Sequence, residues 1–175
     1  MSIFAVYENE RQKTLSQNTN CCNIVFYNGT LQQFVTTLLA NERGDGSVCR
    51  ICEIHPLIVD DMRAKGKPLY SNDIIITQRQ IFKYRNHPKS AKRAAVPLID
   101  YVLIEETLRN PEHIYEDTAQ NRLVYVCTHP YHENKILKVV VDPDFKYRGT
   151  IINIAKSWGI VEENKMRGIQ YRLIQ

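Results

Sequence analysis

The chain has 175 residues, of which 43% are hydrophobic and 24% are charged, and its net charge at pH 7 is +4. This length is enough for a domain with its own core, without help from disulfides or a structural metal. No apolar run approaches the roughly 18 residues that a membrane-spanning helix needs, and the first residues lack the basic start and apolar centre of a secretory signal. The composition therefore predicts a cytoplasmic protein without a membrane partner.

The charge is divided unevenly along the chain. Residues 1–77 contain 7 Lys or Arg and 8 Asp or Glu, which gives a net charge of −1. Residues 78–175 contain 16 Lys or Arg and 11 Asp or Glu, which gives +5. The excess of positive charge in the second part indicates an anionic partner there, such as a nucleic acid.

Five cysteines and no secretory signal argue against a disulfide framework. Cys49 and Cys52 have the spacing of a zinc ligand pair, and Cys21 and Cys22 lie upstream. The spaced pair falls in a predicted strand, however, and the upstream pair is adjacent, whereas zinc ligands usually come as two spaced pairs. Partly buried, reduced thiols are the alternative to a zinc site. We predict no metal or cofactor for the active site.

Strand and helix signals alternate in the first half of the chain. The turn Asn28-Gly29 leads to Thr30, which can cap a helix because apolar residues recur at helical spacing from Leu31 to Leu39. β-branched and aromatic runs predict strands over residues 22–27, 47–54 and 73–77, and a short helix is expected over 57–65.

The second half reads as a helix followed by a small sheet. A helix over 97–108 begins at Pro97 and ends before Pro111, since the residue before proline avoids the helical region. The remaining predictions are a short strand at 113–115, paired strands at 123–127 and 136–141, a turn at 142–149, a third strand at 150–155, and a helix and terminal strand (169–174) in the last twenty residues.

Residues 78–95 form a basic run without a single acidic residue. Such a run can neutralise phosphates, and the counterions released on binding increase affinity. The alternative is a solvated basic loop or helix face, since charge patterning is a weak signal. Its six basic residues are Arg79, Lys83, Arg85, Lys89, Lys92 and Arg93.

The order of motifs from residue 72 to 160 resembles a known family. Arg85-x-His87 precedes a helix, Asn110-Pro111-Glu112-His113-Ile114 follows that helix, and two paired strands lead to a third that opens on Thr150. This order resembles the phage-associated branch of the barnase–EndoU–colicin–RelE-like nucleases. The resemblance implies an α+β fold with a small antiparallel sheet packed against helices. Residues 71–175 would be the RNase-like domain, and residues 1–70 an additional α/β portion of unknown role.

The resemblance also implies an activity. Such a protein would be a toxin-like or phage-derived endoribonuclease that cleaves RNA without metal, by attack of the 2′-hydroxyl on the adjacent phosphate. His87 would act as acid or base, because imidazole titrates near pH 6.5, and Arg85 would hold the phosphate. Thr150 would be the third catalytic residue. Asn153 falls on the opposite strand face from Thr150.

The expected substrate is RNA, with tRNA as one candidate, and a protein antitoxin or inhibitor is a further candidate partner. The alternatives are a catalytically silent nucleic-acid-binding or inhibitor protein of a phage or mobile element, and a structural phage protein with a basic surface. A common cleft formed by His87, Arg85 and Thr150 would distinguish the nuclease from these alternatives. His113, His129 and His132 are predicted to be surface histidines of turns. The expected substrate-binding residues are Lys83, Tyr84, Lys89, Asn153 and Lys156.

Overall fold

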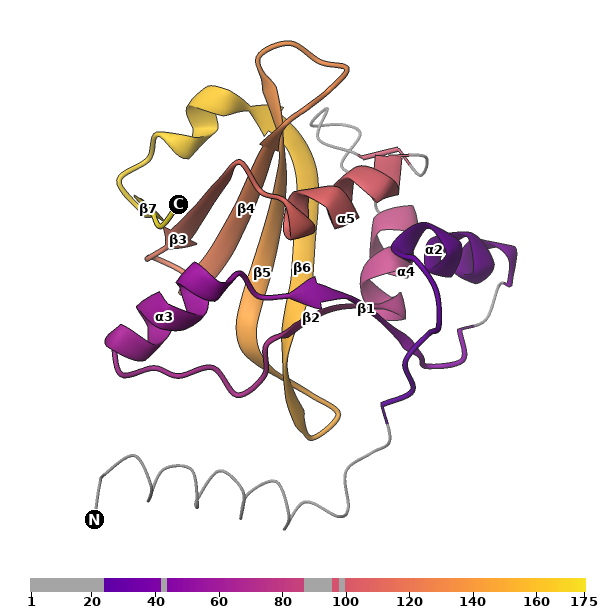
Figure 1. Cartoon of the computed structure of the whole chain (residues 1–175). Helices are drawn as coiled ribbons and strands as arrows, with labels where there is room; N and C mark the ends of the chain where they lie inside the picture. The colour runs from indigo at the N-terminus through magenta and orange to yellow at the C-terminus, as the bar shows by residue number, and fades with distance from the viewer. Residues whose placement is uncertain (1–23, 42–43, 87–95, 98–99) are drawn as a thin grey trace, which may run out of the picture.

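The computed structural model describes residues 24–41, 44–86, 96–97 and 100–175. These residues form an α+β fold around one seven-stranded sheet with the order β1-β2-β6-β5-β4-β3-β7. All neighbouring strands are antiparallel except β2 and β6, which are parallel. The α+β class is confirmed, and the sheet is larger than the small sheet that the sequence predicted (Figure 1).

The elements follow one another in a mixed order along the chain. The described helices are α2 (Leu31–Ala40), α3 (Pro56–Ala64), α4 (Gln78–Asn86) and α5 (Tyr101–Arg109), with a 3-10 helix η3 at Glu163–Met166. The strands are β1 (Val48–Glu53), β2 (Asp73–Thr77), β3 (His113–Asp117), β4 (Arg122–Thr128), β5 (Lys135–Tyr147), β6 (Thr150–Glu162) and β7 (Tyr171–Leu173).

Local signals explain where the helices begin and end. The Thr30 side chain accepts a hydrogen bond from the Gln33 backbone N–H, and the Gln33 side chain accepts one from the Thr30 backbone N–H. Thr30 therefore caps α2, as predicted. Pro56 lies in the first turn of α3, where its missing N–H costs nothing. α5 begins at Tyr101, later than the predicted start at 97, and ends just before Pro111 as predicted.

The hairpin of β5 and β6 is longer than the sequence predicted. Residues 142–147, predicted to be part of a turn, continue β5, and only Arg148 and Gly149 connect the strands, both with positive φ. The pairing with β6 is irregular between Asp142 and Phe145, and Pro143 lies in this irregularity, where its missing backbone donor is tolerated. β6 also continues to Glu162, where a helix was predicted.

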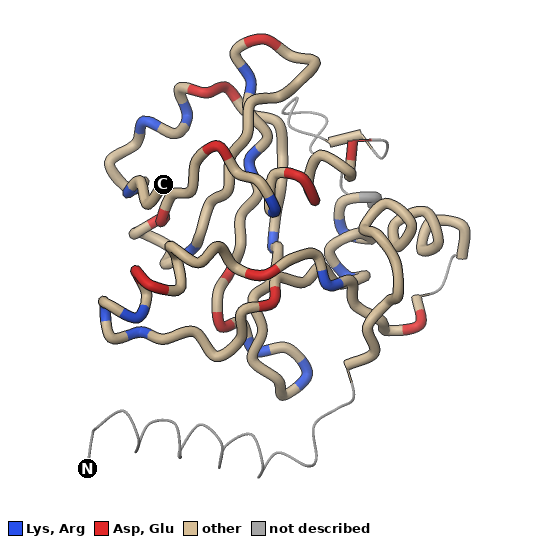
Figure 2. The backbone as a smooth tube through the Cα atoms, viewed as in Figure 1, with Lys and Arg blue, Asp and Glu red and all other residues tan. Residues whose placement is uncertain are grey.

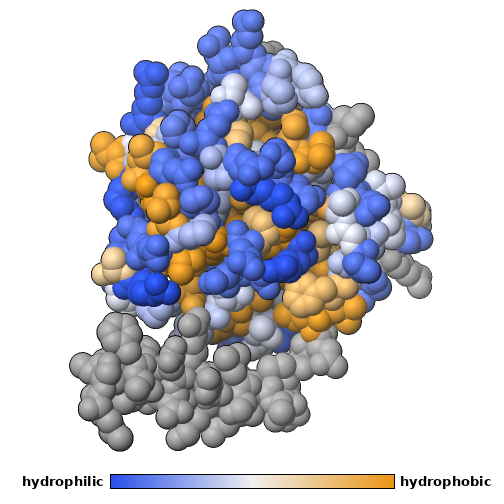
Figure 3. Space-filling view, viewed as in Figure 1, coloured by the Kyte–Doolittle hydropathy of each residue, from blue (hydrophilic) through white to orange (hydrophobic). Residues whose placement is uncertain are grey.

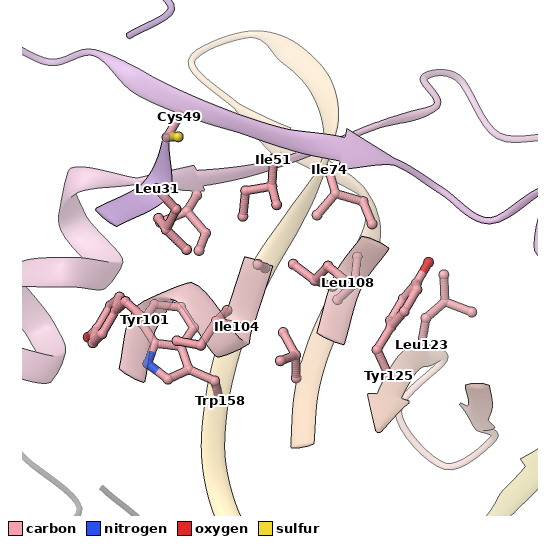
Figure 4. Close-up of a cluster of buried hydrophobic side chains, with 14 of the residues drawn as sticks. Leu31, Cys49, Ile51, Ile74, Tyr101, Ile104, Leu108, Leu123, Tyr125 and Trp158 are labelled. Atoms are coloured by element: carbon pink, nitrogen blue, oxygen red, sulfur yellow. The ribbon is translucent and has the colours of Figure 1, made fainter. Parts of the chain in front are cut away.

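The main hydrophobic core lies between the sheet and the helices. Figure 4 shows side chains of α2, β1, β2, α5, β4 and β6 meeting there, with Trp158 and Tyr101 at one end. Ile51 of β1 and Ile74 of β2 belong to this core, and their strands pair directly. The described residues on the two sides of position 70 thus share one core, and the predicted domain boundary does not separate two cores.

The opposite face of the sheet is called the outer face below. Because side chains alternate along a strand, residues next to core positions point to this face. Two smaller apolar clusters lie there, one around Val48, Ile75, Ile152 and Ile154 and the other around Val124, Val126, Ile136 and Met166. Met166 comes from η3, so the segment after β6 covers the second cluster.

Four charged residues attach the C-terminal strand to α3. Lys65 and Arg172 each contact both Asp61 and Glu116, with N···O distances of 2.6 to 2.8 Å. Burial alone would raise the pKa of Glu116, but hydrogen bonds from Lys65 and Arg172 hold it below its ordinary value. Figure 2 shows acidic and basic positions close together along α3 and near the C-terminus.

The surface shown in Figure 3 is mainly hydrophilic, with apolar patches between the charged groups. Within the described part of the chain, no helix has the length and apolar character needed to cross a membrane.

Candidate functional site

Part of the predicted site can be located in the structure. His87, Lys89, Cys21 and Cys22 lie outside the described residues. Arg85 lies in the last turn of α4, where only its backbone is described, and Lys83 is exposed on the same helix.

Tyr84 packs within the protein, although the sequence suggested that its ring contacts substrate. Its ring stacks on Trp158 with 4.4 Å between centroids, and Tyr101 meets Trp158 edge-on at 5.7 Å. The Trp158 backbone N–H donates to the Tyr84 hydroxyl at 3.3 Å. Asn153 and Ile154 are the β6 residues that pair with β2. Further along β6, α4 lies beside the same edge of the strand.

Asn153 also has a structural role in place of the predicted substrate contact. Its side chain is fully buried, and its Nδ2 donates to the carbonyls of Ser71 at 2.7 Å and Asp73 at 3.1 Å. Its Oδ1 accepts from the Asp144 backbone N–H at 3.1 Å. The amide thereby ties the start of β2 to the irregular part of the β5–β6 hairpin.

Thr150 lies far along β6 from the end of α4. It opens β6 opposite Tyr147, beside the β5–β6 turn at the lower end of the molecule in Figure 1. Trp158, which contacts Tyr84, lies about 26 Å further along the strand at the usual rise per residue. Thr150 and Arg85 therefore lie far apart, and these two of the three predicted catalytic residues do not meet in one site.

Lys156 occupies a bulge of β6. Val140 of β5 pairs with Ser157 and Val141 pairs with Ala155, which leaves Lys156 without a partner residue. Such bulges change the direction of a side chain. The Lys156 ammonium lies 2.5 Å from Asp142 on the outer face and 4.9 Å from the centre of the Phe145 ring, and its side chain is 36% exposed.

Lys156 belongs to a group of polar residues that we call the outer-face strip. Its members lie on the outer faces of β4, β5 and β6, where Asp142 pairs with Ile154 of the first apolar cluster and Lys138 pairs with Val126 of the second. Arg122 Nε lies 3.8 Å from Asp142 and is enclosed without a hydrogen-bond partner among the described residues. Lys138 donates to the Tyr171 hydroxyl at 2.8 Å and lies over its ring. The strip consists of Arg122, Lys138, Asp142, Lys156 and Ser157.

Sequence reasoning found Lys156 but missed the other members of the strip. Lys138 and Asp142 occupy alternate positions of β5 and therefore share a face, a signal present in the sequence. The predicted turn at 142–149 concealed it, because Asp142 and Pro143 are typical turn residues. The alignment of Arg122 with Asp142 depends on strand register, for which the sequence offers no local signal.

The described residues contain no group of three or more His, Cys, Asp or Glu positioned to hold a metal ion. Cys49 and Cys52 are two such potential ligands, and burial raises the pKa of each thiol to about 11. His113 and His132 are exposed in agreement with prediction, whereas His129 is only 3% exposed. The prediction of a surface histidine was wrong for His129, because its ring lies under the β4–β5 turn and accepts a hydrogen bond from the Tyr131 backbone.

Comparison of the chain with protein-family models, curated proteins and solved structures finds no significant match.

Proposed function

We propose that this protein is a metal-independent endoribonuclease, toxin-like or phage-derived, and that the outer-face strip binds the phosphate backbone of RNA. The observation that supports this proposal is the strip itself. It places Arg122, Lys138 and Lys156 on the outer face together with the carboxylate of Asp142, while Asp117 of β3 lies opposite Arg122 on the same face. The resemblance over residues 72–160 points to the same substrate.

The basic run that begins in α4 starts on the other side of the sheet from the strip. Tyr84 places the end of α4 beside Trp158 in the main core, two positions after Lys156 on β6. Ser157 is the β6 hydroxyl next to Lys156, and we assign to it the catalytic role that the sequence assigned to Thr150.

The proposed reaction needs no metal or cofactor. The 2′-hydroxyl oxygen attacks the adjacent phosphorus and loses its proton to a base, the bond from phosphorus to the 5′-oxygen breaks, and an acid protonates that oxygen. The products are a 2′,3′-cyclic phosphate and a 5′-hydroxyl end. Lys156 would stabilise the extra negative charge on the phosphorus oxygens, and His87 would act as acid or base, as the resemblance implies.

A second candidate is a protein that binds RNA on the same strip without cleaving it. The distance between Thr150 and the end of α4 favours this reading, as do the structural roles of Asn153 and Tyr84. These three residues would otherwise have supplied substrate contacts.

Cleavage and binding can be tested with the same variants. Purified wild-type protein, His87→Ala, Lys156→Ala and Lys67→Ala are incubated with total RNA and a tRNA pool in EDTA. Lys67 is the matched control, because it is exposed in the loop after α3 and outside the strip. Wild type should leave cyclic phosphate ends, and His87→Ala should not cleave.

Lys156→Ala should weaken RNA binding about tenfold, since a charge-assisted contact contributes roughly 1.5–3 kcal/mol. It should also reduce the dependence of binding on salt by about one counterion. Binding without cleavage would select the second candidate. Absence of RNA binding by wild type, or equal binding by wild type and Lys156→Ala, would refute the proposed role of the strip.

A further inference from the structure

Two aromatic rings lie on the outer face near the end of the β5–β6 hairpin, at the lower end of the molecule in Figure 1. Phe145 and Tyr147 occupy alternate positions of β5 and therefore share a face. Both pack against the first apolar cluster of the outer face, and both remain partly exposed. The hairpin thus presents aromatic surface that the fold does not fully bury.

We infer that these two rings stack on unpaired bases of RNA, so that the protein selects single-stranded over base-paired segments. This inference rests on the proposed function, because it assumes that the neighbouring strip binds RNA phosphate. It adds the class of RNA that the protein prefers. The charges of the strip do not specify this class, since Asp117 and Asp142 lie beside Arg122 and Lys156 and balance their charge.

The rings continue the strip without a gap. The Lys156 ammonium contacts Asp142 at 2.5 Å and lies 4.9 Å from the centre of the Phe145 ring. Lys156 therefore belongs both to the strip and to the surroundings of the first ring. Tyr147 lies two positions further along β5, about 7 Å away. A phosphate bound at Lys156 would thus bring the bases on either side of it close to these rings.

Each ring has a cation over its face. The Arg148 guanidinium lies 5.4 Å from the centre of the Tyr147 ring, as Lys156 lies over Phe145. At an exposed ring such a contact is weak, and a stacked base contributes more. A base can therefore replace the cation, whose long side chain can then contact the attached phosphate.

Only unpaired nucleotides can offer a base in this way. In a duplex each base is stacked between its neighbours, whereas the bases of loops and single strands can be splayed out onto aromatic side chains. Stacking uses the flat face that all four bases share, so the rings would accept different base sequences. The preference would therefore be for the state of the RNA and not for its sequence.

The end of the hairpin is held in place by the rest of the fold. Arg148 Nη1 donates to the Gly46 carbonyl at 3.3 Å, which attaches the turn to the loop before β1. The Asp144 backbone N–H donates to Asn153 Oδ1 at 3.1 Å, and its carboxylate accepts from the Tyr70 backbone N–H at 3.0 Å. These contacts fix the backbone on both sides of Phe145, and a surface fixed in advance loses less entropy on binding.

The test uses one short RNA sequence with 2′-O-methyl groups that prevent cleavage, prepared as a single strand and as a duplex with its complement. Dissociation constants are measured at several salt concentrations for wild type, Tyr147→Leu, Tyr147→Phe and Tyr131→Leu. Leucine keeps an apolar side chain without the ring, and phenylalanine keeps the ring. Tyr131 is the matched control, because it is 74% exposed in the turn at the other end of β5. Circular dichroism shows whether each variant is folded.

Wild type should bind the single strand about tenfold more tightly than the duplex. Tyr147→Leu should bind the single strand about tenfold more weakly, because one stacked base is lost, and should bind the duplex as wild type does. Its salt dependence should be that of wild type, since no phosphate contact is removed. Tyr147→Phe and Tyr131→Leu should behave as wild type.

Equal binding of the single strand by wild type and folded Tyr147→Leu, or equal losses in Tyr147→Leu and Tyr147→Phe, would overturn the inference alone. Duplex binding by wild type as tight as its single-strand binding would do the same, and this comparison needs no variant to fold. Failure of wild type to bind either RNA would overturn the proposed function and the inference with it.

Discussion

Substitution of Asn153 by alanine distinguishes a structural role from a substrate contact. The sequence placed this residue in the substrate site, but its amide makes three hydrogen bonds inside the protein. Alanine would leave the carbonyls of Ser71 and Asp73 and the backbone N–H of Asp144 without these partners. We therefore expect Asn153→Ala to destabilise the fold and to leave RNA binding unchanged at temperatures where the variant is folded.

The size of the effect follows from these contacts. Each buried polar group that loses its partner costs about 1–3 kcal/mol. Ser71 and Asp73 are partly exposed, so water can replace part of what their carbonyls lose. A total of about 3 kcal/mol is expected, and a protein of this size loses roughly 2–4 °C in Tm per kcal/mol. The Tm should thus fall by about 6–12 °C.

Thermal unfolding followed by circular dichroism measures this change. Asn72→Ala is the matched control, since Asn72 is exposed one residue before β2, and its effect should stay within about 0.5 kcal/mol. An Asn153→Ala protein with the Tm of wild type and about tenfold weaker RNA binding would refute the structural assignment and restore the predicted substrate contact.

Two further predictions concern titratable groups. Burial, with a smaller contribution from His132, lowers the pKa of His129, so the unfolded chain binds this proton at a higher pH than the folded protein does. The free energy of unfolding should therefore fall as pH decreases through about 6.5. Urea unfolding at pH 7.5 and 5.5 should show a smaller loss of this free energy for His129→Gln than for wild type or the exposed control His113→Gln. Equal losses in all three proteins would contradict this reasoning. Burial, with a smaller contribution from Glu105, raises the pKa of Cys49 to about 11, so roughly one thiol in a thousand is ionised at pH 8. Iodoacetamide should label Cys49 much more slowly in the folded than in the unfolded protein, as measured by peptide mass spectrometry, and equally fast labelling of both states would show that the thiol is accessible.

Local signals in the sequence were sufficient for several elements. Thr30 predicts the start of α2 because its side chain can accept a hydrogen bond from a backbone N–H in the first helical turn. Pro111 predicts the end of α5 because its ring excludes the helical conformation at the preceding residue. The β-branched run of β2 likewise predicts a strand from local preferences alone.

Tertiary pairing overrode local preference in the β5–β6 hairpin. Asp142, Pro143 and Gly149 are turn-forming residues, and the sequence predicted one long turn there. The structure extends both strands, because β6 supplies hydrogen-bond partners on one side and the irregular pairing accommodates Pro143. Turn propensity is an effect of a few adjacent residues, whereas this pairing joins segments across the whole hairpin.

The candidate site likewise combines features that the sequence predicts with features that only the fold creates. The sequence by itself determined the excess of basic residues after position 77 and the candidacy of Lys156, but it placed Asp142 in a turn. Only the tertiary structure decided that a bulge directs Lys156 toward Asp142, that strand register adds Arg122, and that Thr150 lies far from α4. The physical reason is that charge and side-chain period are properties of the chain, whereas register, bulges and distances between segments arise only when the strands pair.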